Sequence, residues 1–174
     1  MFEGKVFFRE PATTFRGPRS REPITLNDQP KSVRPTPCID DYPHRTPDII
    51  RYADLDPQGH VNNAVFATYF ETGRVAMFRR PDLGIGVPGG TYVLVHTEID
   101  FLRELRWPGN VEVGTGVSEF GRSSFTVRQA IFHEGTCAAT GLAKLVLIDS
   151  TTRRSRPLTE EGVASLSRWK YLGT

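Results

Sequence analysis

One long helical pattern followed by four strand-like segments is the feature that most limits how this chain can fold. From Asn63 to Arg80, apolar residues recur at spacings of three and four, which predicts a helix with a broad apolar face that ends before Pro81. Alternating or continuous apolar patterns then predict strands, with short turn-forming stretches between them, over residues 91–101, 111–119, 125–133 and 136–149. Short connections favour antiparallel pairing, so the sequence predicts an α+β fold with one helix on one antiparallel sheet.

Smaller patterns complete this prediction. Residues 48–53 are expected to form a strand before the helix, and residues 158–168 a short helix capped by Thr159. Residues 145–148 are apolar on both faces, which predicts a strand inside the sheet or in an interface. Gly73 within the helix would allow close approach of another element. One helix covers one face of a sheet, so we expect the other face or an edge to meet a second copy.

The chain begins with a proline-rich stretch. Eight prolines fall within the first 47 residues, and proline removes hydrogen-bond donors and blocks helices. We therefore expect residues 1–45 to form an irregular extension and residues 46–174 to form the folded domain. A short apolar cluster over residues 6–8 could dock on that domain.

Charge and composition exclude several classes of protein. The net charge is +2, and basic and acidic residues balance over residues 48–174, so no nucleic-acid partner is expected. No apolar run approaches the roughly 18–20 residues that span a membrane, and the N-terminus is too charged for a signal peptide. A cytoplasmic protein is therefore expected. The two cysteines, Cys38 and Cys137, are expected to stay reduced.

The junction between the first strand and the helix is dense in polar residues. Within ten residues stand Asp54, Asp56, His60, Asn62 and Asn63, and a turn shaped by Pro57 and Gly59 lies among them. The start of a helix presents unpaired N–H groups and partial positive charge. Such a site can stabilise a carbonyl oxygen that gains negative charge, while a nearby carboxylate acts as base or nucleophile.

Other interpretations of this junction compete with catalysis. A calcium loop starting at Asp54 would need Glu at its twelfth position, where Val65 stands. A mononuclear metal site from Asp54, Asp56 and His60 stays open, although the spacing matches no known pattern. Asp56 and Asn62 could also be simple turn and cap residues.

A second motif, a G-x-G-x-x-G match, lies at residues 84–89. It precedes a strand rather than a helix, which is the wrong context for binding a dinucleotide.

The pattern D-x-D-x-x-G-H-V-N-N at residues 54–63, with F-E-x-x-R at residues 70–74, resembles the hotdog-fold acyl-CoA thioesterases of the 4-hydroxybenzoyl-CoA thioesterase type. The resemblance continues through residues 96–101, 108–110 and 121–125. It covers about residues 46–150 and leaves the proline-rich stretch outside.

This resemblance implies a hotdog fold, in which an antiparallel sheet wraps a long helix and two copies join their sheets. It implies a homodimer, or a homotetramer made as a dimer of dimers, with active sites at the dimer interface. Asp56 corresponds to the catalytic carboxylate, which attacks the thioester carbonyl or activates water. The N–H near Asn63 would polarise that carbonyl, and His60 and Asn63 would shape the site.

Substrate contacts are also implied by the resemblance. Arg122 corresponds to a position that contacts the nucleotide of coenzyme A, although a solvated turn arginine is an equal alternative. Helix aromatics such as Phe66, Tyr69 and Phe70 would line an acyl tunnel together with a partner subunit. Glu71 and Arg74 are expected to form a salt bridge. The expected substrate-binding residues are Gly59, Asn62, Phe66, Arg122, Ser123 and Ser124.

The sequence thus predicts an enzyme that hydrolyses acyl-CoA to free acid and coenzyme A, without a metal or a cofactor. Two alternatives stay open: a hotdog module that binds an acyl group or coenzyme A without catalysis, and a thioesterase acting on a carrier-protein thioester. A dehydratase of the same fold is less favoured, because its arrangement of histidine and acid is not found. The sequence does not specify the acyl group.

Overall fold

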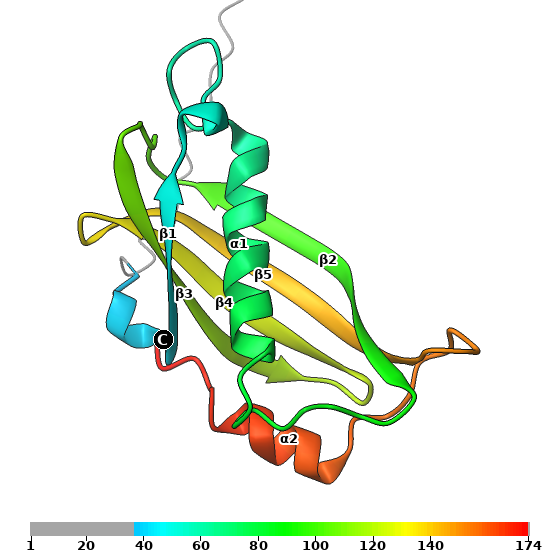
Figure 1. The fold of residues 1–174 in the computed structure, drawn as a ribbon. Helices are drawn as coiled ribbons and strands as arrows, with labels where there is room; N and C mark the ends of the chain where they lie inside the picture. Colours follow the sequence, from blue (N-terminus) through cyan, green and yellow to red (C-terminus); the bar gives the residue numbers. More distant parts are fainter. Residues whose placement is uncertain (1–36, 174) are drawn as a thin grey trace, which may run out of the picture. The chain divides into compact units, whose positions relative to one another are not determined.

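A five-stranded antiparallel sheet carries one long helix in the computed structural model, which describes residues 37–173. Helix α1 (Asn63–Phe78) lies across one face of the sheet (Figure 1). The strand order is β1-β3-β4-β5-β2, and every neighbouring pair is antiparallel. The strands are β1 (His44–Ile50), β2 (Gly90–Phe101), β3 (Gly109–Phe120), β4 (Ser124–His133) and β5 (Thr136–Asp149). The predicted α+β fold is confirmed, whereas the expectations for residues 1–36, including docking by residues 6–8, lie outside the described residues.

Helix α1 is held on the sheet by its apolar stripe. One face of the helix is buried, at steps of three and four residues that include the adjacent pair Tyr69 and Phe70. Its buried residues are Phe66, Tyr69, Phe70, Gly73 and Met77. Each large apolar side chain that leaves water contributes about 1.5–3 kcal/mol. The N-terminal half packs against side chains such as those of Val113, Ile131 and Ala139, and the C-terminal half against those of Val117, Val127 and Leu145.

Gly73 lets the helix approach the sheet closely, as the sequence predicted. A Cβ atom at this position would lie 2.6 Å from Val113 Cγ1, 3.0 Å from Thr115 Oγ1 and 3.1 Å from Gln129 Nε2. These three side chains come from β3 and β4, so the glycine meets the middle of the sheet. A larger residue would force the helix away from it.

Strand β1 differs from its prediction. It runs over His44–Ile50 instead of residues 48–53, and residues 52–54 form the short 3₁₀ helix η2 (Tyr52–Asp54). Pro47 sits inside β1 opposite Glu112. Because β1 is an edge strand, the missing N–H of Pro47 is tolerated. Ahead of β1, helix η1 (Ile39–Asp41) leads to Tyr42, which is buried beside Phe132 although it falls in the range predicted as an extension.

The remaining elements agree with the sequence patterns within a few residues. Strand β5 lies between β4 and β2, which explains why Leu145, Leu147 and Ile148 are all buried. Helix α2 (Glu160–Ser167) is capped by Thr159, whose Oγ1 accepts a hydrogen bond from Gly162 N at 3.0 Å. It packs through Leu166 at the end of the sheet where α1 stops (Figure 1). No helix among residues 37–173 is long and apolar enough to cross a membrane.

Candidate active site

A closed loop precedes α1 and carries the predicted catalytic residues. Asp56 N donates to His60 O at 2.8 Å, and Gly59 N donates to Asp56 O at 3.0 Å. Gly59 has φ of +79°, a left-handed conformation that glycine adopts without strain. Val61 N donates to Leu105 O at 2.9 Å, which ties the loop to the segment after β2. The sequence D-P-Q-G-H therefore forms a compact turn that is fastened at both ends.

The carboxylate of Asp56 is held by one oxygen only. Its Oδ1 accepts hydrogen bonds from Gln58 N at 2.8 Å and from His60 N at 3.2 Å. Its Oδ2 makes no hydrogen bond with any residue in the described part of the chain, and the side chain is partly exposed. The turn thus orients the carboxylate while leaving one oxygen available to a reacting group.

Helix α1 starts directly after this loop. Asn62 is the N-cap, and its Oδ1 accepts from Ala64 N at 2.9 Å. Asn63 is the first helical residue, so its N–H has no acceptor within the helix. The side chain of Asn62, predicted to bind substrate, is engaged as the helix cap. The N–H of Asn63 stands at the positive end of the helix, within the same loop-to-helix junction as Asp56.

Asp54 has a different environment from Asp56. Its Oδ2 accepts hydrogen bonds from Tyr69 Oη at 2.9 Å and from Arg51 N at 2.7 Å. Tyr69 is completely buried, and burial together with the hydrogen bond to Asp54 raises the pKa of its phenol. Tyr69 therefore belongs to the core of this chain and does not line a tunnel. Phe66 is also buried, and its ring packs edge-on against Phe101.

His60 has two partners that the sequence analysis did not identify. Its Nε2 lies 3.1 Å from Glu104 Oε2 and also contacts Nη2 of Arg106. Nη2 of Arg106 also lies 3.2 Å from Oε2 of Glu104. The sequence does show a charged–apolar–charged alternation at Glu104, Leu105 and Arg106. No pattern in the sequence, however, indicates that these side chains contact His60.

A cleft of about 190 Å³ lies between α1 and β2. Arg74 lines it with its side chain turned into the sheet, where its Nη1 donates to Gln129 Oε1 at 2.8 Å. Burial lowers the pKa of this arginine, while the charge of Glu71 opposes that shift. The expected Glu71–Arg74 salt bridge is absent among the described residues, because Gln129 takes the guanidinium. The cleft is lined by Ala67, Thr68, Phe70, Glu71, Arg74, Leu94 and Thr97.

Three predicted substrate contacts lie far from Asp56. Arg122 and Ser123 form the turn between β3 and β4, and Ser124 begins β4. The next residue, Phe125, packs against Phe78 at the C-terminal end of α1. A helix of sixteen residues is about 24 Å long, so one chain does not bring this turn to the loop of Asp56.

The described residues contain no group of three His, Cys, Asp or Glu side chains placed to hold a metal ion. Asp54, Asp56 and His60 therefore do not form a preformed metal site. Each of the three already has its own partners: Tyr69 for Asp54, backbone amides for Asp56, and Glu104 with Arg106 for His60.

The fold and this junction together define a hotdog protein of the thioesterase class. A model of the thioesterase-like superfamily matches residues 50–166, which include the loop, α1, strands β2 to β5 and the last residue of β1. The chain belongs to the thioesterase-like superfamily. A search of curated proteins gave no match.

Solved structures with the same fold agree with this assignment. A thioesterase from Thermus thermophilus, complexed with coenzyme A and Zn, is 33% identical, with a TM-score of 0.66 over 75% of this chain and 96% of that one. The PA5185 protein from Pseudomonas aeruginosa PAO1 is 25% identical, with a TM-score of 0.70 over 80% and 100%. A DHNA-CoA thioesterase from Staphylococcus aureus is 24% identical, with a TM-score of 0.64 over 72% and 89%, and shows the fold alone.

Proposed function

We propose that this protein hydrolyses acyl-CoA thioesters to the free acid and coenzyme A, with Asp56 as the reacting carboxylate. The observation that carries the proposal is the state of Asp56: Oδ1 is anchored by two backbone amides, and Oδ2 is left open beside the start of α1. A turn or cap residue needs only the anchored oxygen. Membership of the thioesterase-like superfamily and the coenzyme A complex of the Thermus relative support the same chemistry.

The reaction follows from these groups. Asp56 attacks the thioester carbonyl carbon, or it takes a proton from a water that attacks, and the carbonyl oxygen gains negative charge. The N–H of Asn63, at the positive end of α1, stabilises that oxygen. The C–S bond then breaks, and the thiolate leaves and takes up a proton. Where Asp56 itself attacked, water then cleaves the anhydride between the acyl group and Asp56 and frees the carboxylate, so that by either route water supplies the hydroxyl of the free acid. No step requires a metal or a cofactor.

The complete site is proposed to need two copies of the chain. Strand β2 is an edge strand, and Leu94, Val95 and Phe101 on it are about half exposed. Such an edge favours pairing with another strand. If two copies pair antiparallel through β2, the Phe101 end of one strand lies beside the Gly90 end of the other.

That pairing brings the two halves of the predicted site together. Phe101 contacts Phe66 near the start of α1, close to the loop of Asp56. Tyr92, near the other end of β2, pairs with Leu147, whose N–H donates to Ser123 O at 2.9 Å. The turn of Arg122 and Ser123 in one copy therefore approaches Asp56 in the other, where it would bind the nucleotide of coenzyme A. A homodimer, or a dimer of such dimers, is the proposed working unit.

Thiol release from a panel of acyl-CoA esters tests the proposal in wild type, Asp56→Asn and Asp40→Asn. An asparagine Oδ1 still accepts the two backbone hydrogen bonds, so Asp56→Asn keeps the turn while removing the base or nucleophile. We expect turnover to fall roughly 10²–10⁴-fold with unchanged thermal unfolding. Asp40→Asn removes an exposed carboxylate on η1 and serves as the matched control.

The outcomes separate the alternatives. Wild-type turnover in Asp56→Asn would exclude Asp56 as the reacting group. If the wild-type protein cleaves no acyl-CoA but binds a non-hydrolysable analogue, it is a binding module. If it cleaves only acyl groups carried on a carrier protein, then coenzyme A is not the leaving group, and the assignment of Asp56 as the reacting carboxylate is retained.

A further inference from the structure

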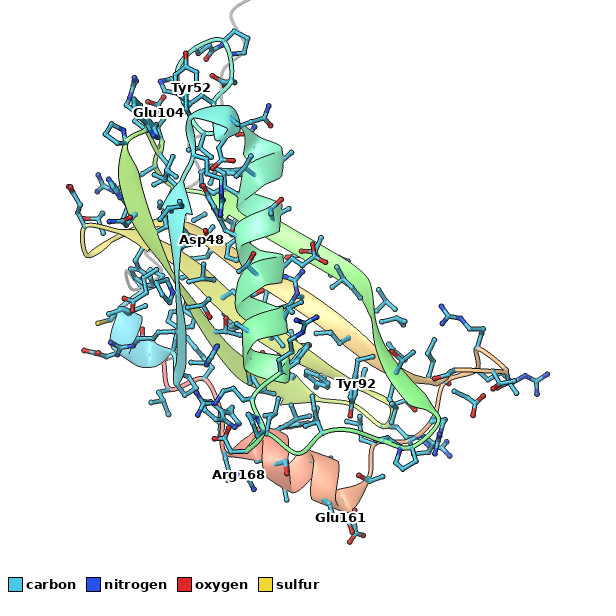
Figure 2. The ribbon with its side chains drawn as sticks, viewed as in Figure 1. Asp48, Tyr52, Tyr92, Glu104, Glu161 and Arg168 are labelled. Atoms are coloured by element: carbon cyan, nitrogen blue, oxygen red, sulfur yellow. The ribbon has the colours of Figure 1, made fainter. Side chains whose placement is uncertain are left out.

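The segment that follows β2 is docked against the loop of His60 in a way that presents two opposite charges to it. Leu105 O accepts from Val61 N, and the Leu105 side chain is 1% exposed in the core. Because neighbours in an extended segment point to opposite sides, burial of Leu105 turns Glu104 and Arg106 outward together. Figure 2 places Glu104 near Tyr52, at the end of the molecule where α1 begins.

Both outward side chains meet the same nitrogen of His60. Glu104 Oε2 is 3.1 Å from Nε2, and Arg106 Nη2 contacts that nitrogen as well. A carboxylate only accepts hydrogen bonds and a guanidinium only donates them. When Nε2 carries a proton it donates to Glu104, and when it has lost that proton it accepts from Arg106. The ring therefore has a partner in either state.

The backbone of His60 is tied directly to the proposed catalytic carboxylate. His60 N donates to Asp56 Oδ1, and His60 O accepts from Asp56 N. The charged groups that face His60 are thus Asp56 from its own loop and Glu104 and Arg106 from the segment after β2. A displacement of the imidazole would act on the loop that orients Asp56.

We infer that Glu104 and Arg106 are positioning residues that hold the His60 ring beside Asp56 in both of its protonation states. For the part that concerns turnover, this inference rests on the proposed thioesterase function. The geometric part stands independently, because it concerns only three side chains and one nitrogen.

The direct test is the nuclear magnetic resonance spectrum of the His60 imidazole nitrogens in the full chain, recorded with the ring protonated and again with the ring neutral. We expect Glu104→Ala to change the Nε2 signal mainly in the protonated ring and Arg106→Ala mainly in the neutral ring, because each variant removes the partner of that state. Glu98→Ala is the matched control, since Glu98 Oε1 lies 2.8 Å from Nε2 of a different histidine, His96. That variant should change the signals of His96 and leave those of His60 in place.

Turnover in double variants then links the ring to the reaction. We expect Glu104→Ala and Arg106→Ala each to lower kcat, and neither to lower it further when His60 is already alanine, because both act through the ring. A purely structural role would lower activity in the His60→Ala background as well. Unchanged His60 signals in both variants would overturn the inference. State-specific signal changes in a protein that cleaves no thioester would instead reject the proposed function and retain the positioning of the ring.

Discussion

At the scale of single residues, the two aspartates of the D-x-D pattern have separate tasks. Asp54 accepts hydrogen bonds from the buried Tyr69 and from Arg51 N, so it fastens the loop to α1 and to the end of β1. Among the described residues, Asp56 accepts hydrogen bonds only from backbone amides, through Oδ1. Although the two aspartates are only two positions apart, the carboxylate of Asp54 stabilises the fold, and that of Asp56 has an oxygen available for chemistry.

A second residue-scale property is the buried His44, which couples stability to pH. His44 Nε2 lies 3.0 Å from Thr46 Oγ1, and its ring packs edge-on against Trp169. Burial and then the charge of Arg80 lower the pKa of His44, and Asp82 opposes this shift in part. The folded protein therefore binds fewer protons at this site than the unfolded chain does.

The sign of the pH effect follows from that difference. The contribution of neutral His44 to the free energy of unfolding is complete above the unfolded value of about 6.5 and is lost as pH falls through the lower folded pKa. We expect stability in urea to decrease as pH falls below about 6.5, and His44→Gln to lose that part of the decrease. Equal slopes in the two proteins would show that His44 is not responsible.

At the scale of elements, the contact between α1 and the sheet depends on the absence of a side chain at Gly73. Alanine is favoured over glycine in a helix by about 1 kcal/mol, so propensity alone predicts that Gly73→Ala stabilises the protein. The added Cβ would lie 2.6 Å from Val113 Cγ1, well inside van der Waals contact. Overpacking of this kind costs about 1–3 kcal/mol, so packing opposes propensity and exceeds it.

We therefore expect Gly73→Ala to reduce the free energy of unfolding, measured by urea titration. Gly86→Ala is the matched control, because a Cβ there meets no atom within 4 Å and the backbone is not left-handed. That variant should be neutral or slightly stabilising. Stabilisation by Gly73→Ala would mean that the helix can move away from the sheet without reducing the free energy of unfolding.

At the scale of the whole molecule, the exposed apolar edge of β2 predicts self-association. The sequence already indicated a second copy, because one helix cannot cover a sheet completely. The structure identifies the edge, since among residues 37–173 strand β2 has a neighbour only on the β5 side and exposes Leu94, Val95 and Phe101.

We expect the wild-type protein to sediment as a dimer or a larger even assembly, and Val95→Asp to shift it towards the monomer with loss of turnover. A charge in an interface strand is costly to bury, and a separated copy lacks the Arg122 turn of its neighbour. Leu172→Asp changes an apolar residue that is 69% exposed outside β2 and should alter neither property. A monomeric wild-type protein with full activity would contradict the two-copy site.

Contacts between neighbours along the chain explain the features that the sequence predicted correctly. The α+β class, the start of α1 after Asn62, the cap at Thr159 and the limits of β5 follow from periodicity, capping chemistry and turn residues. The resemblance around residues 54–63 indicated the hotdog fold for the same reason, since that pattern is one continuous turn. The roles of Asp56, His60 and Asn63 in catalysis stay predictions.

The features that the sequence did not predict depend on contacts between residues far apart in the chain. Strand β1 continues through Pro47, which is tolerated because the strand lies at an edge, and Arg74 donates to Gln129 instead of pairing with Glu71. Glu104 and Arg106 contact His60 although more than forty residues separate them from it in the sequence. A local sequence pattern indicates where the chain turns and which face of an element is apolar. Contacts such as these form only when distant segments pack together, so no short stretch of sequence predicts them.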